Sequence, residues 1–448
     1  MNRGPSTPRI ALRAGALSPC IACLCLLFPV LLLSGGCGGG DEAGERDADV
    51  STAEQWETPG GRWHPLREGA ATEEQLEEIE KLKSIGYLAG STRPPEIWGV
   101  TVYDSTRAWD GLNFYTSGDA PGAILMDMRG NVLHKWTYSF MDAWRQGPGG
   151  ELPRSSKGAG FWRRAHLFKN GDVLAIFDGH GIIKVDRNSK LVWARFGGFH
   201  HDLDVMSDGR IYTLLREPKI IPRINPDHPV LEEFIVVLDA DGSELRRVSQ
   251  LEAIERGGRL DLLEGMKDDG DIFHTNTIEV LDGSLAARDP AFRAGNVLIC
   301  IRELDNIAIV DMDSEQVVWG LEGPWLKQHQ PTVLENGNML IFDNGGSRGA
   351  SRVLEFDPVT REIVWVYKGD ANRLFHSPQC GSNERLPNGD TLISETDRGR
   401  ALEVTPEGEI VWEYVNPAQA GDEGQYIASL FEVIRIPRDY VKSWLRME

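Results

Sequence analysis

One motif occurs six times along the chain, and it limits the possible folds more than any other feature. Each copy has an apolar strand, an Asp or Thr at its end, a short turn and a second apolar strand, which in most copies ends near Trp. The six turn positions are Asp127, Asp186, Asp239, Asp311, Asp357 and Thr405. Their spacings of 59, 53, 72, 46 and 48 residues indicate an architecture built from one repeated supersecondary unit.

A second hairpin lies between these copies, with Asn-Gly or Asp-Gly at its tip. Clear examples are HLFKNGDVLAIF (166–177), DLDVMSDGRIYTLL (202–215), TVLENGNMLIFD (332–343) and ERLPNGDTLISE (384–395). Asn-Gly and Asp-Gly adopt the positive φ angles that tight hairpin turns require, so they are strong hairpin signals. Two hairpins in each unit predict a four-stranded antiparallel sheet.

The chain is therefore predicted to be all-β, and six such units indicate a six-bladed β-propeller over residues 99–436. The first unit is one strand short, because only residues 111–118 precede its Asp hairpin. We expect the run 427–436 to supply the missing strand and to close the ring. The repeated Trp residues are predicted to pack between blades.

The segments before and after the repeats are predicted to form a leader, a tether and a tail. Residues 1–37 combine three Arg with an apolar run and have the pattern of a secretory leader. Cys37 follows small residues and resembles the lipidated cysteine of a bacterial lipoprotein, although a plain cleaved leader or an uncleaved anchor would also fit. Residues 38–98 have the composition of a flexible tether, in which 73–88 have the spacing of one amphipathic helix that docks on the propeller. Residues 437–448 are expected to form a tail.

Charge and cysteine content exclude several classes of protein. The chain has 47 Lys and Arg against 68 Asp and Glu, a net charge of −21, and it has no basic run. Nucleic-acid binding needs clustered Lys and Arg, so it is not expected. Only Cys300 and Cys380 lie beyond Cys37, which makes neither a disulfide framework nor a zinc motif. Whether these two cysteines pair stays open.

The histidines share one place in the repeat. His201, His274 and His329 each stand four residues before an apolar strand residue, and further histidines at strand entrances are His166, His200 and His376. The first strand of each propeller blade lines the central axis, so equivalent positions should converge at one end of the channel. His134 and His180 lie near turns and are expected at the surface.

The return strand of each hairpin leads back to the same end of the channel. The seventh residue after the hairpin Gly is, in order, Asp178, Arg216, Arg302, Asn344 and Thr396. Arginine and histidine donors aimed at one point favour a small multivalent anion. Three imidazoles can also hold Zn, but Arg302 would repel a cation, so no metal and no cofactor are expected. Strand alternation predicts that Glu303 points away from Arg302.

At this point the sequence resembles the bacterial arylsulfotransferases, which are aryl-sulfate sulfotransferases that do not use the adenylyl sulfate donor. The resemblance rests on GVTVYDSTRAWDGLNFYTSG (99–118), FHTNTIEV (273–280), ICIRELDNIAIVD (299–311) and KQHQPTVLENGNMLIFDNG (327–345), and it extends over residues 99–436. It implies a six-bladed propeller that is periplasmic or at the cell surface. It also implies ping-pong transfer of a sulfuryl group from a phenyl sulfate to a phenol through a sulfated histidine.

The resemblance implies a role for each matching residue. His329 would be the nucleophile, and His201, His274 and Arg302 would hold the sulfate oxygens. Substrate-binding roles are assigned to His200, Asn276, Arg216, Asn344 and His376. The sequence alone leaves His200 and His201 as alternatives for one position, and the strand register favours His201. A neutral imidazole is a good nucleophile at neutral pH, which suits this chemistry.

Two other functions are compatible with parts of the pattern. A non-catalytic propeller at the cell surface that binds an anionic or sulfated ligand, or a partner protein, is the main alternative, because a fold alone does not define a function. Quinone-cofactor dehydrogenases are propellers with repeated Trp, but they need eight blades and a set of metal ligands, and neither is visible in this sequence. The sequence predicts no oligomeric state.

Overall fold

Six four-stranded antiparallel sheets follow one another along the chain in the computed structural model. It describes residues 72–83, 88–147, 158–370 and 373–446, which all belong to the second of two units, Arg62–Glu448. The predicted leader and Cys37 lie outside the described residues. The predicted six-bladed β-propeller is confirmed.

Within each blade the strands follow one another from the central axis outward. Blade 1 contains β30 (Leu430–Ile436), β2 (Leu112–Ser117), β3 (Gly122–Met126) and β4 (Val132–Thr137). Blade 2 contains β5 (Arg164–Leu167), β6 (Val173–Phe177), β7 (Gly181–Val185) and β8 (Leu191–Phe196). Blade 3 contains β9 (Phe199–Val205), β10 (Ile211–Ile221), β11 (Asn225–Leu238) and β12 (Glu244–Ser249).

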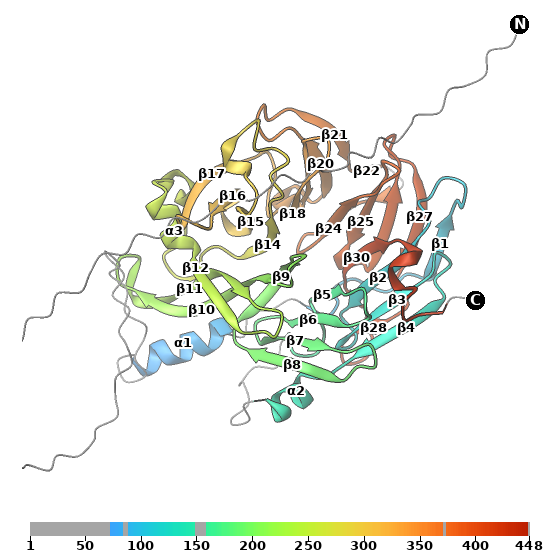
Figure 1. Ribbon diagram of the computed structural model, residues 1–448, viewed down its shortest axis with the longest axis horizontal. Helices are drawn as coiled ribbons and strands as arrows, with labels where there is room; N and C mark the ends of the chain where they lie inside the picture. Colours follow the sequence, from blue (N-terminus) through green and yellow to red (C-terminus); the bar gives the residue numbers. More distant parts are fainter. Residues whose placement is uncertain (1–71, 84–87, 148–157, 371–372, 447–448) are drawn as a thin grey trace, which may run out of the picture. The chain divides into compact units, whose positions relative to one another are not determined.

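The second half of the chain repeats the same order. Blade 4 contains β14 (Thr275–Val280), β15 (Val297–Ile301), β16 (Asn306–Asp311) and β17 (Gln316–Glu322). Blade 5 contains β18 (His329–Val333), β19 (Met339–Asp343), β20 (Arg352–Phe356) and β21 (Ile363–Tyr367). Blade 6 contains β24 (Ser382–Arg385), β25 (Thr391–Glu395), β26 (Arg400–Val404) and β27 (Ile410–Val415). The labels of the six inner strands encircle the middle of Figure 1.

The two ends of the described chain interlock in blades 1 and 6. β30 pairs antiparallel with β2, from Leu112 opposite Ile436 to Ser117 opposite Leu430, so the C-terminal run supplies the inner strand that blade 1 was predicted to lack. In addition, β1 (Gly99–Tyr103) pairs with β27 and adds a fifth strand to blade 6. The sequence pattern did not indicate this outer strand.

Tryptophans in the outer strands hold neighbouring blades together. The indole N–H groups of Trp136, Trp193 and Trp365 donate to the carbonyls of Gly171, Ala240 and Pro406, which lie in turns of the next blade. Trp412 closes the ring by donating to the carbonyl of Met128 in blade 1. The predicted packing of Trp between blades is confirmed. A buried indole with its N–H satisfied combines a large apolar contact with a directional bond.

Among the described residues, three α-helices and a few short strands lie outside the blades. α1 (Glu73–Lys83) begins at a capping box, in which Thr72 N–H donates to Gln75 Oε1 and Gln75 N–H donates to Thr72 Oγ1. Gln75 Nε2 also donates to the carbonyl of Asp227, so α1 contacts the β10–β11 hairpin (Figure 1). The described helix covers Glu73–Lys83 of the predicted 73–88, and residues 84–87 lie outside the described residues.

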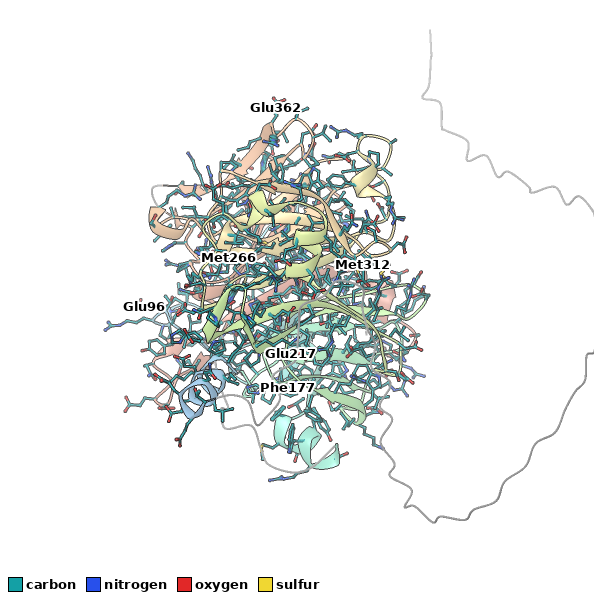
Figure 2. The ribbon with its side chains drawn as sticks, turned by 90° about the vertical axis from the view of Figure 1, so that its left-hand side faces the viewer. Glu96, Phe177, Glu217, Met266, Met312 and Glu362 are labelled. Atoms are coloured by element: carbon teal, nitrogen blue, oxygen red, sulfur yellow. The ribbon has the colours of Figure 1, made fainter. Side chains whose placement is uncertain are left out.

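The remaining elements bridge or extend blades. α2 (Phe140–Gln146) contacts blade 2 through Phe140, whose ring centroid lies 5.5 Å from that of Phe177. Phe177 is labelled just above this helix in Figure 2. α3 (Gln250–Arg256) follows β12. The short strands are β13 (Gly270–Asp271), β22 (Gly369–Asp370), β23 (Arg373–Leu374), β28 (Gln419–Ala420) and β29 (Tyr426–Ile427). β13 pairs in parallel with β11.

Candidate active site

The inner strands of blades 3, 4 and 5 are irregular at their entrances, where the predicted site histidines lie. Their pairing registers shift beside His201, between Thr275 and Thr277, and between His329 and Thr332. Left-handed φ angles occur at His201 (57°), His274 (48°) and Gln330 (49°). A β-bulge re-aims a side chain, and positive φ angles in residues other than Gly are uncommon and often occur at functional sites.

A cavity of about 450 Å³ lies next to these entrances. Its polar wall includes His201, His274, Arg216 and Arg302 from blades 3 and 4. Its apolar wall includes Leu88, Pro378 and Phe431. The lining therefore combines cationic and N–H donors with apolar side chains, and it also includes the carboxylates of Asp178 and Asp397. His200, Asn276, His329, Asn344 and His376 lie outside its lining.

His329 is buried beside the polar wall, with 2% of its surface exposed. Its Nδ1 lies 2.7 Å from Asn344 Oδ1 and 3.1 Å from the carbonyl oxygen of Lys327. Both neighbours are acceptors, so the neutral ring carries its proton on Nδ1 and its lone pair on Nε2. Burial lowers the pKa of His329 well below its usual range, and the positive charge of Arg302 lowers it further. The ring is therefore a neutral base at neutral pH.

Asn344 holds His329 in place. Its Nδ2 donates to the carbonyls of Ser377 (2.6 Å) and Cys380 (3.0 Å). These two bonds fix the amide so that Oδ1 must face His329. Asn344 is not among the residues that line the cavity, and its amide is engaged by His329 and two backbone carbonyls, so the substrate-binding role predicted for it becomes a positioning role.

Arg302 enters the cavity because the chain leaves the strand at this residue. β15 ends at Ile301, and residues Arg302–Leu304 form a turn of 3₁₀-helix. The prediction that Glu303 points away from Arg302 is wrong, because strand alternation no longer applies there: Arg302 Nη1 lies 2.6 Å from Glu303 Oε1. Lys267 and Lys327 also contact Glu303, so this carboxylate is shared among three cations.

Asp271 holds His274 and was not identified from the sequence. Its Oδ2 lies 2.5 Å from His274 Nδ1, and its Oδ1 accepts from the backbone N–H of His274 at 3.0 Å. Burial raises the pKa of Asp271, but the interaction with His274 outweighs burial and holds that pKa below its usual range. The only signal was an acidic residue three positions before the histidine, on a short strand that the pattern did not predict.

His200 and His201 lie at different depths, and of the two only His201 lines the cavity. His201 lines the cavity, whereas His200 is fully buried and lies behind it, with the two Nδ1 atoms 2.6 Å apart. On the far side of His200, Nε2 lies 2.8 Å from Glu233 Oε2. The strand register had favoured His201 for the cavity, and the geometry agrees.

Asn276 and His376 have other partners. Asn276 Nδ2 donates to the carbonyl of Gln328, and its Oδ1 accepts from Thr277 Oγ1. This amide therefore supports the segment just before His329. The backbone N–H of His376 donates to Glu395 Oε1, and Pro378 and Gln379, which follow it, line the cavity.

The apolar wall includes a segment of the predicted tether. The carbonyl of Ala89 accepts from the N–H of Ser429, and the carbonyl of Thr92 accepts from the N–H of Ile427. These bonds hold Leu88–Thr92 against the chain that leads into β30, and they bring Leu88 and Ser91 to the cavity. No repeat or motif marked these residues.

The structure also answers one question that the sequence left open and corrects one prediction. Cys300 and Cys380 are both free thiols; Cys300 Sγ contacts the carbonyl of Gln328, and Cys380 Sγ contacts Arg163 Nη2. His180 was expected at the surface but is 6% exposed, because its ring packs 5.4 Å from that of Phe140 in α2.

Within the described ranges, no group of three or more His, Cys, Asp or Glu residues is arranged to hold a metal ion. No helix among the same residues has the length and apolar character needed to cross a membrane.

The fold and the cavity define a class of protein: a six-bladed propeller with histidines and arginines gathered at one end of its axis. The family model for arylsulfotransferase (ASST) matches residues 164–417, which is more than half of the 448 residues. The chain therefore belongs to the arylsulfotransferase family, as its motifs predicted. Membership supports an arylsulfotransferase activity in general terms, with aryl sulfates and phenols as small-molecule substrates.

No curated protein matches the chain. Among solved structures, a Bacteroides caccae protein of unknown function is 13% identical, with a TM-score of 0.45 over 73% of this chain and 99% of that one. The WD40 propeller of Doa1 is 14% identical, with a TM-score of 0.40 over 78% and 96%. Virginiamycin B lyase from Staphylococcus aureus is 11% identical, with a TM-score of 0.33 over 57% and 69%. These similarities are too low to say anything about the site.

Proposed function

We propose that the protein transfers a sulfuryl group from an aryl sulfate ester to a phenolic acceptor, with His329 as the residue that carries it between the two. The observation that supports this most strongly is the state of His329. Two fixed acceptors at Nδ1 leave the lone pair on Nε2, and burial together with Arg302 keeps the pKa of the ring low. An imidazole held in this way is a nucleophile that needs no base to activate it.

The first half-reaction forms a bond between His329 Nε2 and sulfur while the bond from sulfur to the aryl oxygen breaks. The electron pair of that bond leaves on the aryl oxide, which needs little help from an acid when the phenol is acidic. The sulfated ring keeps its proton on Nδ1 and becomes cationic. Asn344 Oδ1 and the Lys327 carbonyl then stabilise that charge, because both accept from the same N–H.

The second half-reaction reverses the first with a different phenol. The acceptor oxygen attacks sulfur, the bond to Nε2 breaks, and the ring recovers its lone pair. The phenolic proton leaves for a base, and His274 is suited to take it because Asp271 holds its other nitrogen at 2.5 Å. This division of the reaction predicts ping-pong kinetics.

The polar wall is suited to the sulfuryl oxygens. Arg302, His201 and His274 line the cavity together, and Arg302 supplies a permanent positive charge. Negative charge on the sulfuryl oxygens and on the leaving oxygen would be met by groups that are already in place. Arg216, beside Asp178 in the same wall, provides a second cation.

The apolar wall is suited to the aryl group. Phe431 stacks against Phe161, with ring centroids 4.8 Å apart, and the guanidinium of Arg163 lies 5.0 Å from its ring centroid. Leu88 lies at the mouth of the cavity with 66% of its surface exposed. A phenyl ring placed against Phe431 and Leu88 would be bound by apolar contact while its sulfate faces the arginines.

We further propose that the protein is exported and held at a membrane by a lipid on Cys37, in the periplasm or at the cell surface. The support is the pattern of residues 1–37: a basic start, an apolar run and a cysteine after small residues. Metabolic labelling with a fatty-acid analogue tests this. The label should appear on the wild-type protein and be lost in Cys37→Ser, and an unlabelled wild type would contradict it.

The catalytic proposal is tested by mixing the purified protein with 4-nitrophenyl sulfate and phenol and following nitrophenolate. Release should depend on phenol and should be lost in His329→Ala. His376→Ala is the control, because this histidine precedes the inner strand of the neighbouring blade, its backbone N–H donates to Glu395 Oε1, and the proposed mechanism gives its ring no role; this variant should keep its activity. Release that persists in His329→Ala would contradict the assignment of the nucleophile, and no release from any variant would favour a binding role.

A further inference from the structure

The short turn that carries Arg302 ends at a residue in an uncommon backbone conformation. β15 is followed by the 3₁₀ turn Arg302–Leu304 and then by Asp305, which has a left-handed φ of 53°. Blade 6 repeats this arrangement: the 3₁₀ turn Thr396–Arg398 follows β25, and Gly399 comes next with a φ of 56°. Glycine adopts such angles freely, whereas residues with a side chain are strained there. Blade 4 therefore has a side chain at a place where blade 6 has none.

The carboxylate and the carbonyl of Asp305 both hold the segment that leads to His329. Its Oδ1 accepts from the backbone N–H of Lys327 at 2.6 Å, and its carbonyl accepts from Trp325 Nε1 at 2.9 Å. A backbone N–H and an indole N–H can only donate, so the direction of both bonds is fixed. Lys327 has a positive φ of 56°, and its carbonyl is one of the two acceptors beside His329 Nδ1. Asp305 therefore holds the residue that supports the proposed nucleophile.

Gln328 ties the same segment to both ends of the turn. It is fully buried, and its Nε2 donates to the carbonyl of Ile301 at 3.2 Å and to that of Asn306 at 2.9 Å. Both partners are acceptors, so the nitrogen of the amide must be the atom that faces them. Ile301 and Asn306 are the residues immediately before and after Arg302–Asp305. The residue that precedes His329 therefore spans the base of that turn.

The turn also contacts the segment before His274. The backbone N–H of Glu303 donates to the carbonyl of Phe273 at 3.0 Å, and Phe273 is the residue immediately before His274. In addition, Glu303 Oε2 lies 3.2 Å from Lys327 Nζ, which adds an ion pair to the bonds toward blade 5. The turn is therefore joined to the segments that carry two of the site histidines.

We propose that Asp305 and Gln328 are positioning residues that align His329 with the sulfuryl group bound by Arg302. This inference rests on the proposed function, because the alignment matters only if His329 attacks a group that Arg302 holds. Arg302 comes from blade 4 and His329 from blade 5, so bonds between the two segments are needed to fix their separation. Attack requires the reacting atoms to lie about 3–3.5 Å apart, and a displacement of about 1 Å can slow a reaction about a hundredfold.

Two substitutions of Asp305 separate the effect of its side chain from that of its backbone conformation. Asp305→Asn keeps an acceptor for the N–H of Lys327, whereas Asp305→Gly removes it, and both new residues tolerate a positive φ. The nitrophenolate burst from saturating 4-nitrophenyl sulfate without acceptor should be about tenfold slower in Asp305→Gly but within about threefold of the wild type in Asp305→Asn. Gln328→Met, which removes both donated bonds, should also slow the burst.

Two readouts distinguish alignment from a loss of stability or of anion binding. The rate constant of the burst does not depend on the amount of folded protein, so a less stable variant would keep it. The calorimetric affinity for inorganic sulfate should be unchanged in the Asp305 variants, because the groups that line the cavity are kept. Equal burst rates in Asp305→Asn and Asp305→Gly would overturn the inference, and so would parallel losses of burst rate and sulfate affinity.

Asp289→Gly is the matched control. Asp289 Oδ1 also accepts from a backbone N–H, that of Ala291 at 2.9 Å, in the loop at the opposite end of the blade 4 strands. Its loss should lower the melting temperature without slowing the burst. Slowing equal to that in Asp305→Gly would contradict a specific role for Asp305.

Hydrogen exchange reads the bond between Asp305 and Lys327 without any reaction. Mass spectrometry of the peptide that contains Trp325–Gln328 should show one amide that exchanges slowly in the wild type and in Asp305→Asn, and about tenfold faster or more in Asp305→Gly. Equal exchange in all three proteins would overturn the inference, whether or not the protein transfers sulfate. A wild type that protects this amide but releases no nitrophenolate from aryl sulfates would contradict the proposed function alone.

Discussion

Removing the Asn344 side chain tests how far the state of His329 controls the reaction. Asn344→Ala deletes the shorter of two acceptors at Nδ1, at 2.7 Å, and leaves the Lys327 carbonyl at 3.1 Å. Loss of a buried hydrogen-bond partner costs about 1–3 kcal/mol. Because one acceptor stays, we expect a value in the lower part of that range. An increase of about 1.5 kcal/mol in the activation free energy makes the sulfation of His329 about tenfold slower.

The assay is the rapid release of nitrophenolate from 4-nitrophenyl sulfate in the absence of acceptor, which isolates the first half-reaction. Asn344 also donates to two backbone carbonyls, so the variant is expected to melt at a lower temperature. Asn296→Ala is the control, because Asn296 is equally buried and donates to the carbonyl of Ala291 in blade 4, away from the cavity. Equal slowing of the burst in both variants, or an unchanged burst in Asn344→Ala, would refute this role for Asn344.

Three further predictions concern the cavity and the channel. Asp271→Asn should lower kcat/KM about tenfold by releasing His274, measured in steady state with 4-nitrophenyl sulfate, and an unchanged value would mean that Asp271 is only structural. Phe431→Ala should raise KM for aryl sulfates but leave the calorimetric affinity for inorganic sulfate intact; parallel losses in both would contradict the assignment of Phe431 to the aryl group. Burial raises the pKa of Glu279 to about 8, so the folded state holds a proton that the unfolded state has released, and stability falls as pH rises from about 4.5 to 8. Glu279→Gln should therefore raise the melting temperature more at pH 8 than at pH 5, and an equal effect at both would contradict the shift.

The propeller could be predicted because its signals are local and repeated. Asn-Gly or Asp-Gly tips mark four of the inner hairpins, and an Asp or Thr turn marks each of the six outer ones, so the outer turns alone were enough to count the units. The same spacing placed His201, His274 and Arg302 at one end of the channel. The position of a residue within the repeat therefore predicts at which end of the axis it lies.

The features that the sequence could not reveal depend on breaks in that regularity or on contacts between distant elements. Arg302 and Glu303 meet because the chain turns into a 3₁₀-helix, which strand alternation cannot anticipate. Glu233 reaches His200 from another strand of blade 3, and a single Glu in an apolar strand carries no motif. Leu88 reaches the cavity from a segment whose composition indicated only a tether.

The most direct test is whether His329 itself carries the sulfuryl group. The purified protein is incubated with 4-nitrophenyl sulfate without acceptor, digested at alkaline pH and analysed by mass spectrometry, beside His329→Ala and His274→Ala. We predict a peptide containing His329 that is heavier by one sulfuryl group, which disappears when phenol is added before digestion and is absent from His329→Ala. A sulfuryl group on any other residue, or transfer to phenol with no modified peptide, would contradict the proposed mechanism.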